Sequence, residues 1–258
     1  PEGRIILDRR DPATTTGTGA KMIMELLSEL TSITNSEPGC PVMWQGVEVW
    51  GNSNVNHNSN ANRNAHGFLD MKEQSKIRNA HNGVILGKTL MPFGNSCDPP
   101  SADPAYPPYD LAFCGGILDA IESNSFIGNG VGVRMLPFRY NNFSLIRSCD
   151  FEGGVLLDQF YDSGSSHPYS GSNFPNRTPW YGEANQKGRS CIGIYMWSIK
   201  DLTLDRNDFH DIQAGIESYN AAFKTKYNTF DDHQYGIDVN NTVSSPNFVF
   251  RCFEFKSS

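Results

Sequence analysis

A 21-residue repeat near the C-terminal end limits the folds that this chain can adopt. Residues 202–220 read LTLDRNDFHDIQAGIESYN, and residues 223–241 read FKTKYNTFDDHQYGIDVNN. In both stretches an Asn lies two residues before a Phe, and a Gly-Ile pair begins six residues after that Phe. A repeat of this length, with apolar residues at alternate positions, is typical of short strands stacked on the equivalent strands of the next repeat. The sequence therefore predicts an all-β fold, a right-handed parallel β-helix.

The same spacing can be followed towards the N-terminus. Phe126 is preceded by Asn124 and followed by a Gly-Val pair, and Phe151 has Cys149 where the other repeats have Asn. Each repeat predicts one coil of the β-helix, with one reference residue in the core. The predicted reference residues are Ile77, Phe126, Phe151, Phe209, Phe230 and Phe253.

Stacking gives each repeated position a physical role, because identical positions in successive coils lie about 4.8 Å apart. The Phe residues are expected to fill the core, and the Asn residues to bond the backbone of neighbouring coils at a bend. The recurring Gly is expected to serve turns that need positive φ. A second inward row is predicted from Val84, Val133, Ile216 and Ile237. Four residues before each Phe, the outward series Glu122, Arg147, Asp205 and Lys226 alternates in charge, so that stacked neighbours attract one another.

The net charge and hydropathy of the sequence argue against some classes of binding partner. The formal charge of −7 argues against nucleic acid or an anionic membrane as a partner, and no stretch is apolar enough to form a transmembrane segment. Repeat folds are not limited by one globular core, so residues 1–258 are expected to form a single domain. Because the first residue is Pro1, we expect a mature or excised piece of a longer chain.

The six cysteines lack the spacing of a zinc site, which favours an oxidising compartment. Cys97 and Cys114 bracket one Pro-rich stretch, and Cys149 and Cys191 bracket another long stretch. We predict that each pair closes its own loop as a disulfide. The alternative is that Cys149 and Cys191 are buried thiols in the coil ladders.

The N-terminal quarter contains several predicted elements. Residues 4–7 and 43–51 are predicted strands. Residues 20–30 fit either a helix that caps the open end of the β-helix or an extended segment. Residues 52–67, rich in Asn, are predicted to be a solvated loop.

Two long insertions interrupt the coils, at about residues 91–113 and 158–189. The prolines of the first insertion exclude regular strand or helix interior. The second contains many aromatic residues, of which Tyr169, Trp180 and Tyr181 are candidate ligand-binding residues because aromatic rings suit the apolar faces of sugars. The favoured alternative is that these rings pin the insertion to the wall of the β-helix.

The best candidates for chemistry follow the Phe in the two clearest repeats. His210 and Asp211 are expected to stack against Asp231, Asp232 and His233 of the next coil. Two carboxylates one strand spacing apart would share a proton or bind a hard cation such as Ca²⁺. Such pairs serve glycoside hydrolases and polysaccharide lyases, but turn positions also carry Asp, Asn and His to cap the backbone, and that role is favoured.

A second outward pair, Glu217 over Asp238, continues towards Arg134. Nothing basic repeats near Asp211 or Asp232, which counts against a lyase. The sequence contains no nucleophile elbow, phosphate-binding loop or HExxH zinc motif.

Several segments of the sequence together resemble a known family. They are MWQGVEVWG, SKIRNAHNGVIL, GGILDAIESNSFIGNGVGVRMLPF and CIGIYMWSIKDLTLDRNDF followed by GIESYNAAF. As a set they resemble the large secreted β-helix proteins of Bacteroidetes, many of which carry a C-terminal sorting domain for type IX secretion. The resemblance covers the chain from about Met43 onward, and it favours the extended form of residues 20–30.

The resemblance implies an extracellular or outer-surface location, with secretion machinery as a partner through a sorting domain that is missing here. It supplies no catalytic motif. The expected function is therefore binding or structural, with polysaccharide or other cell-surface material as the ligand. The alternative is a carbohydrate-active enzyme that uses the paired acids.

Overall fold

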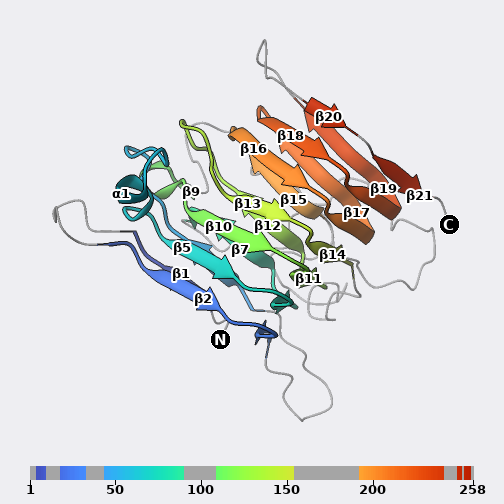
Figure 1. Cartoon of the computed structure of the whole chain (residues 1–258), viewed down its shortest axis with the longest axis horizontal. Coiled ribbons are helices and arrows are strands. Elements are labelled where there is room, and N and C mark those ends of the chain that lie inside the picture. Colours follow the sequence, from blue (N-terminus) through green and yellow to red (C-terminus); the bar gives the residue numbers. More distant parts are fainter. Residues whose placement is uncertain are drawn as a thin grey trace, which may run out of the picture.

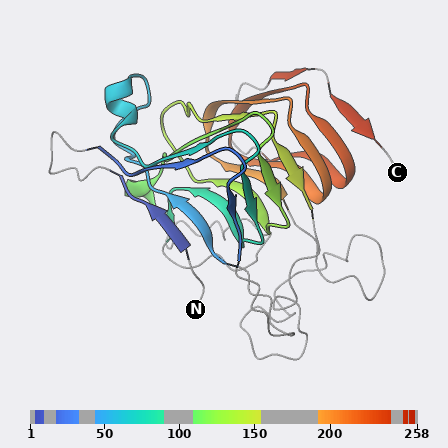
Figure 2. The same ribbon diagram turned by 60° about the horizontal axis from the view of Figure 1, so that its bottom comes forward.

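The computed structural model describes residues 4–9, 18–32, 44–89, 109–153, 192–240, 249–251 and 253–256. In these residues almost every regular element is a strand, and each strand of the two large sheets pairs in parallel with the strand of the next coil. Figure 1 shows the strands stacked in sequence order from the N-terminal to the C-terminal end, and Figure 2 shows the coils from a second side. The predicted parallel β-helix is confirmed.

Each coil has three faces. The first face is a seven-stranded sheet of β2 (Lys21–Met24), β5 (Phe68–Met71), β10 (Ile117–Ile121), β13 (Leu145–Arg147), β16 (Lys200–Asp205), β18 (Ala222–Lys226) and β20 (Val249–Arg251). The second face contains β3 (Glu29–Leu30), β6 (Lys76–Arg78), β11 (Ser125–Ile127), β14 (Asp150–Glu152) and β21 (Glu254–Lys256). The third face contains β1 (Arg4–Leu7), β4 (Gly46–Val49), β7 (Asn82–Leu86), β12 (Val131–Met135) and β15 (Ile192–Trp197).

The second and third faces belong to one twelve-stranded sheet because two long strands run through both. These are β17 (Asp208–Tyr219) and β19 (Thr229–Asn240). Asp211 has a φ of 56°, which turns β17 from the second face to the third. The remaining elements are α1 (Asn60–Arg63), η1 (Leu111–Phe113) and the antiparallel pair β8 (Lys88–Thr89) and β9 (Tyr109–Asp110).

A ladder of stacked Phe rings fills the core beneath the second face. The centroid distances are 4.9 Å from Phe126 to Phe151, 4.8 Å from Phe151 to Phe209, and 5.0 Å from Phe209 to Phe230. The last ring is Phe255, which stacks on Phe230 at 5.3 Å. The prediction of Phe253 for this position is wrong, because β21 aligns Phe255 with Phe230. Phe253 is partly buried and packs against the core from the preceding bend.

The second inward row is confirmed on the third face. Its members align in register as Val47, Val84, Val133, Ile194, Ile216 and Ile237. Together with the Phe ladder and the inward residues of the first face, this row forms one continuous apolar core.

The recurring Gly does not serve turns, so that prediction is wrong. Gly132, Gly193, Gly215 and Gly236 lie within strands of the third face and have no positive φ. They are Gly because the Phe ring of the following coil covers them: a Cβ on Gly193 would lie 2.7 Å from Cδ1 of Phe209. The Gly and Phe of adjacent coils therefore form a matched pair.

The Asn ladder is confirmed. Asn207 accepts a hydrogen bond from the backbone N–H of Cys149 at 3.0 Å, and its amide donates to the carbonyl of Ile146 at 3.2 Å. Asn228 accepts from the backbone N–H of Asn207 at 2.7 Å, and Asn124 accepts from that of Ser75 at 3.0 Å. Each Asn thus bonds the coil that precedes it at the bend between the first and second faces.

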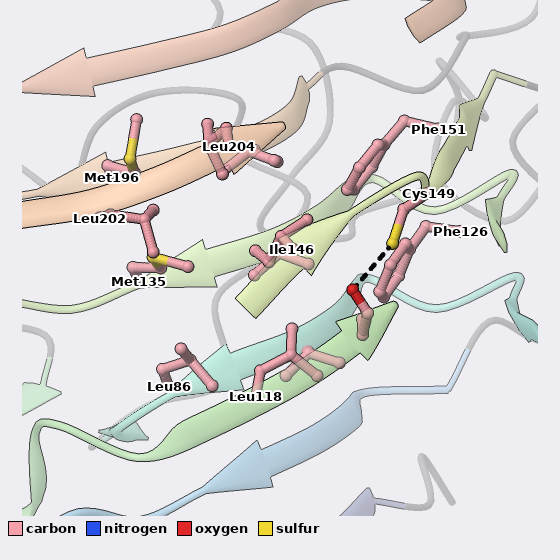
Figure 3. Packing of buried hydrophobic residues seen from close by; sticks show 14 of the residues in the cluster. Leu86, Leu118, Phe126, Met135, Ile146, Cys149, Phe151, Met196, Leu202 and Leu204 are labelled. Atoms are coloured by element: carbon pink, nitrogen blue, oxygen red, sulfur yellow. Dashed lines mark hydrogen bonds between the residues drawn. The ribbon is translucent and has the colours of Figure 1, made fainter. Parts of the chain in front are cut away.

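Cys149 takes the place of Asn in its own coil. Its Sγ lies 3.2 Å from the carbonyl oxygen of Ala120, so the thiol makes the contact to the preceding coil that an Asn amide makes elsewhere (Figure 3). The thiol is free, and burial raises its pKa to about 12. Cys114 is also free and buried. The two predicted disulfides are therefore wrong, and the alternative of a buried thiol is confirmed for Cys149.

Replacing Asn207 with alanine is expected to destabilise the fold by about 2–3 kcal/mol, because it leaves a buried N–H and a buried carbonyl unpaired. Chemical denaturation of the variant measures this change. The matched control is Asn240→Ala, at an exposed position of β19, which should change the free energy of unfolding by less than about 0.5 kcal/mol. Equal effects for the two variants would contradict a bridging role for the Asn ladder.

The outward charge series is confirmed in part. Arg147, Asp205 and Lys226 are in register, and the Lys226 ammonium lies 3.8 Å from the Asp205 carboxylate. Glu122 does not belong to the series, because Ile121 is the residue opposite Arg147. Glu122 and Ser123 both have positive φ and add one residue to the turn.

The N-terminal segments are extended. Residues 20–30 form β2 and β3 with a turn between them, so the alternative of a capping helix is wrong. The strand predicted at 4–7 is present as β1, and the strand predicted at 43–51 is shorter than expected, as β4 at Gly46–Val49. Residues 52–67 differ from the expected solvated loop, because they contain α1 and three buried polar residues, Asn52, His57 and His66.

The insertions fall largely outside the described residues. In the first, residues 109–113 form β9 and η1, which differs from the expected absence of regular structure, and residues 91–108 are not described. The whole of residues 158–189 lies outside the described part. Among the helices of the described ranges, none combines the length and apolar character needed to cross a membrane.

Candidate functional site

A charged outward surface that includes several of the predicted residues lies on the second face, on both sides of the Phe ladder. Residues directly before and after each Phe point outward because strand side chains alternate. Glu152, His210 and Asp231 follow the Phe in three successive coils and are in register, while Asp150 and Asp208 precede it. We call Asp150, Glu152, Asp208, His210, Asp211 and Asp231 the acidic face.

His210 is the centre of the acidic face. Its Nε2 lies 2.7 Å from Oδ1 of Asp150, and its Nδ1 lies 3.7 Å from Oδ2 of Asp211. The hydrogen bond to Asp150 is the main cause that raises the pKa of His210 to about 9; partial burial opposes it, and the charge of Glu152 adds to it. The imidazole is therefore positively charged at neutral pH and is surrounded by carboxylates.

The loss of one carboxylate is expected to return His210 towards ordinary titration. In Asp150→Asn, the pKa of His210 should fall from about 9 by about one pH unit or more, because the charged partner of its closest hydrogen bond is gone. An NMR titration of the His210 ring measures this change. Asp238→Asn, on the third face, is the control and should leave the titration unchanged. An unchanged pKa in Asp150→Asn would show that the two side chains are not paired.

Three side chains of the acidic face could hold a metal ion. One ligand atom each from Asp150, Glu152 and His210 lies within 4.8 Å of the other two. An imidazole nitrogen with two carboxylates suits Zn²⁺ or a similar transition metal better than the expected Ca²⁺, which prefers an all-oxygen set. An ion would have to displace the proton of His210 and break its ion pair with Asp150.

The structure places the predicted site residues in three different environments. His210, Asp211 and Asp231 lie on the acidic face. Asp232 lies in β19, opposite Asp211 by register, and its side chain is outside the described part. His233 pairs with Ile212 and lies 5.9 Å from the rings of both Phe230 and Phe255, so it packs against the core.

The other candidates are not part of this surface. Tyr169, Trp180 and Tyr181 lie outside the described residues. Glu217 and Asp238 are neighbours on the third face, as predicted, but Tyr195 lies between Glu217 and Arg134. Arg134 is fully buried, donates from Nε to Asn82 at 2.8 Å and stacks over the Tyr195 ring.

Sequence reasoning missed Asp150, Glu152 and Asp208. The signal was available, because each of them directly flanks a Phe of the predicted ladder and must share its outward face. The repeat that contains Phe151 departs from the common pattern, because it has Cys149 in place of Asn and lacks the Gly.

Comparisons of the chain with protein-family models, with curated proteins and with solved structures found no match.

Proposed function

We propose that this chain is a non-catalytic, carbohydrate-binding β-helix domain and that the acidic face is its binding surface. The observation that carries the proposal is the convergence of Asp150, Glu152 and His210, from two adjacent coils, on one outward sheet surface. Carboxylates accept hydrogen bonds from hydroxyl groups, and an imidazolium donates them. Their charge makes those hydrogen bonds stronger than neutral ones.

The negative charge of the acidic face determines which polysaccharides it can bind. The acidic face holds five carboxylates and one imidazolium, Lys256 is in register with Asp231 at its edge, and the whole chain carries a formal charge of −7. A polysaccharide rich in carboxylate or sulfate would be repelled unless a cation bridged the two surfaces. The proposed ligand is therefore a neutral polysaccharide, which the acidic face does not repel, or an amino-sugar polysaccharide, which it attracts.

The proposed location is extracellular or on the outer cell surface. Its support is the combination of the parallel β-helix with the phrases that resemble secreted Bacteroidetes proteins. In this proposal the chain is one part of an adhesin-like protein that reaches the surface by type IX secretion, and a rigid stack of coils displays the acidic face.

A carbohydrate-active enzyme is the second candidate. It is favoured by the closeness of two carboxylates on the acidic face, since the ligand atoms of Asp150, Glu152 and His210 lie within 4.8 Å of one another. Retaining glycosidases hold their two carboxyl groups about 5–5.5 Å apart. The charged His210 would then supply the positive group that the sequence did not reveal near the acids.

Retention and cleavage can be scored in one experiment. The purified chain is passed over immobilised neutral glucan, chitosan and pectate, each with Ca²⁺, with Zn²⁺ or with chelator, and the soluble fraction is assayed for new reducing or unsaturated chain ends. We expect retention on neutral glucan or chitosan without new ends. New ends that disappear in Asp150→Asn would establish the enzyme instead. Lack of retention on every polysaccharide would contradict a carbohydrate-binding function.

A further inference from the structure

Two buried histidines hold the Asn-rich loop, residues 52–67, at the corner between the third and first faces. His57 and His66 are 2% and 1% exposed. The His57 ring stacks on Phe138 with a centroid distance of 4.6 Å, and the His66 ring meets that of His57 edge-on at 4.4 Å. Phe138 lies at the equivalent corner two coils later, between β12 and β13, so the two rings tie the loop to that corner. Figure 1 shows α1, which lies within this loop, outside the stacked sheets.

The hydrogen bonds of both rings require neutral imidazoles. His57 Nδ1 accepts from the backbone N–H of Phe143 at 3.3 Å, and its Nε2 faces the carbonyl of Gly115 at 2.9 Å. His66 Nδ1 accepts from the backbone N–H of Asn52 at 3.1 Å. This network assigns the ring proton to Nε2 in both residues. A second proton on either ring would point at a backbone N–H and remove its acceptor.

The charged surroundings oppose protonation further. Beyond burial, Arg63 acts against a positive charge on His57, and His57 and then Arg9 act against one on His66. The carbonyl of Gly115, for both rings, and that of Val55, for His66, act in the opposite direction without outweighing burial. Arg63 is paired with Asp119 at 3.3 Å. From the segments that pack on the loop, Arg139 donates to Asn54 at 3.2 Å, and Cys114 is a neutral buried thiol whose pKa burial raises to about 12. The carboxylate among these groups, that of Asp119, is paired with Arg63.

We propose that the Asn-rich loop is an acid-released latch, in which protonation of His57 and His66 expels both rings and frees the loop from Phe138 and Phe143. This inference does not depend on the acidic face or on its ligand. Release exposes the Phe138 ring. It also breaks the hydrogen bonds of the two rings to Gly115, Phe143 and Asn52, which lie at the corners of three coils. The latch therefore changes the surface of the β-helix in acid without requiring the stack of coils to unfold.

The difference in pKa between the docked and the released histidines sets the pH range over which the loop is released. Burial lowers the pKa of His57 to about 4 and that of His66 to about 3, whereas a released His titrates near 6.5. Because the docked values are depressed, the released loop binds more protons below about pH 6.5, so docking weakens as the pH falls. With two protons involved, the ratio of released to docked loop should rise by up to about a hundredfold per pH unit between about pH 6 and pH 4.

Hydrogen exchange and NMR of the full chain test the latch. Between pH 7 and pH 4 the amides of Phe143 and Asn52 should lose protection by about a thousandfold or more, while the amide of Cys149, which donates to Asn207, stays protected. At neutral pH both rings should show the Nε2–H tautomer. Ring titration near pH 6.5 with unchanged amide protection would overturn the proposal, and so would simultaneous loss of protection at Cys149.

A matched variant removes the titration but keeps the acceptors. In His57→Asn/His66→Asn, each side-chain oxygen can take the place of Nδ1, and protection of Phe143 and Asn52 should no longer depend on pH. A variant that keeps the same pH dependence would contradict the assignment to these two rings. If this variant does not fold, the ring titrations of the unaltered chain decide the question alone.

Discussion

Replacing Gly215 with alanine is expected to destabilise the β-helix by about 3 kcal/mol or more, the upper part of the range for overpacked cores. A Cβ at this position would lie 2.5 Å from Cε1 of Phe230 and 2.7 Å from the backbone oxygen of Gly236. Both neighbours are fixed, since Phe230 is fully buried in the ring stack and Gly236 lies within β19. Urea denaturation followed by circular dichroism measures the change.

The control for this variant is Thr229→Ala, which alters an outward position next to Phe230 and should change the free energy of unfolding by less than about 1 kcal/mol. A cost below about 1 kcal/mol for Gly215→Ala would show that the strands can move apart and that Gly is not required beneath the ring. The same steric pairing recurs in Gly132 with Phe151 and in Gly193 with Phe209.

Replacing Phe209 with alanine is expected to cost about 3–5 kcal/mol, because the variant leaves a cavity in the middle of the ring stack. The Phe209 ring lies between Phe151 at 4.8 Å and Phe230 at 5.0 Å. Differential scanning calorimetry or urea denaturation measures the loss.

Phe255 is the matched control within the same ladder. Among the described residues its ring stacks face to face with Phe230 alone, and the residue is 59% exposed, so Phe255→Ala should cost less than about half as much. Equal costs for Phe209→Ala and Phe255→Ala would mean that burial in the stack does not determine the contribution of each ring.

The fold could be predicted from the sequence because one repeated spacing carries most of the information. Asn, Phe and Gly recur at fixed distances, and parallel stacking turns those distances into ladders. The wrong register predictions lie where a local conformation changes the number of residues between strands. The extra turn residue at Glu122 and Ser123 shifted one charge series. In FVFRCFEF, Phe253 lies in the bend before β21, and Phe255 within β21 is the residue in register with Phe230.

The reason for the recurring Gly could not be deduced from spacing alone. A Gly that recurs at a fixed position is expected in a turn with positive φ and equally beneath a closely packed ring. Only the three-dimensional structure distinguishes these two roles. The contact is between coils: the ring over Gly193 belongs to Phe209, which the chain reaches in the following coil.

The candidate site was predictable in part. His210 and Asp231 were found because they lie in the two most similar repeats, whereas Asp150 and Glu152 were missed in a repeat that departs from the pattern. His57 and His66 lie in a polar, Asn-rich stretch with no apolar periodicity. Their burial depends on Phe138, which is distant in sequence and comes into contact only through coil stacking.

The most direct test of the proposed function is the affinity of the double variant Asp150→Asn/Glu152→Gln for whichever polysaccharide retains the unaltered chain, measured by isothermal titration calorimetry beside Asp238→Asn. If the acidic face binds the ligand, the double variant should lose about tenfold or more in affinity, since each lost charged hydrogen bond is worth about 1.5–3 kcal/mol, and Asp238→Asn should bind normally. Unchanged affinity in the double variant would contradict the assignment of binding to the acidic face.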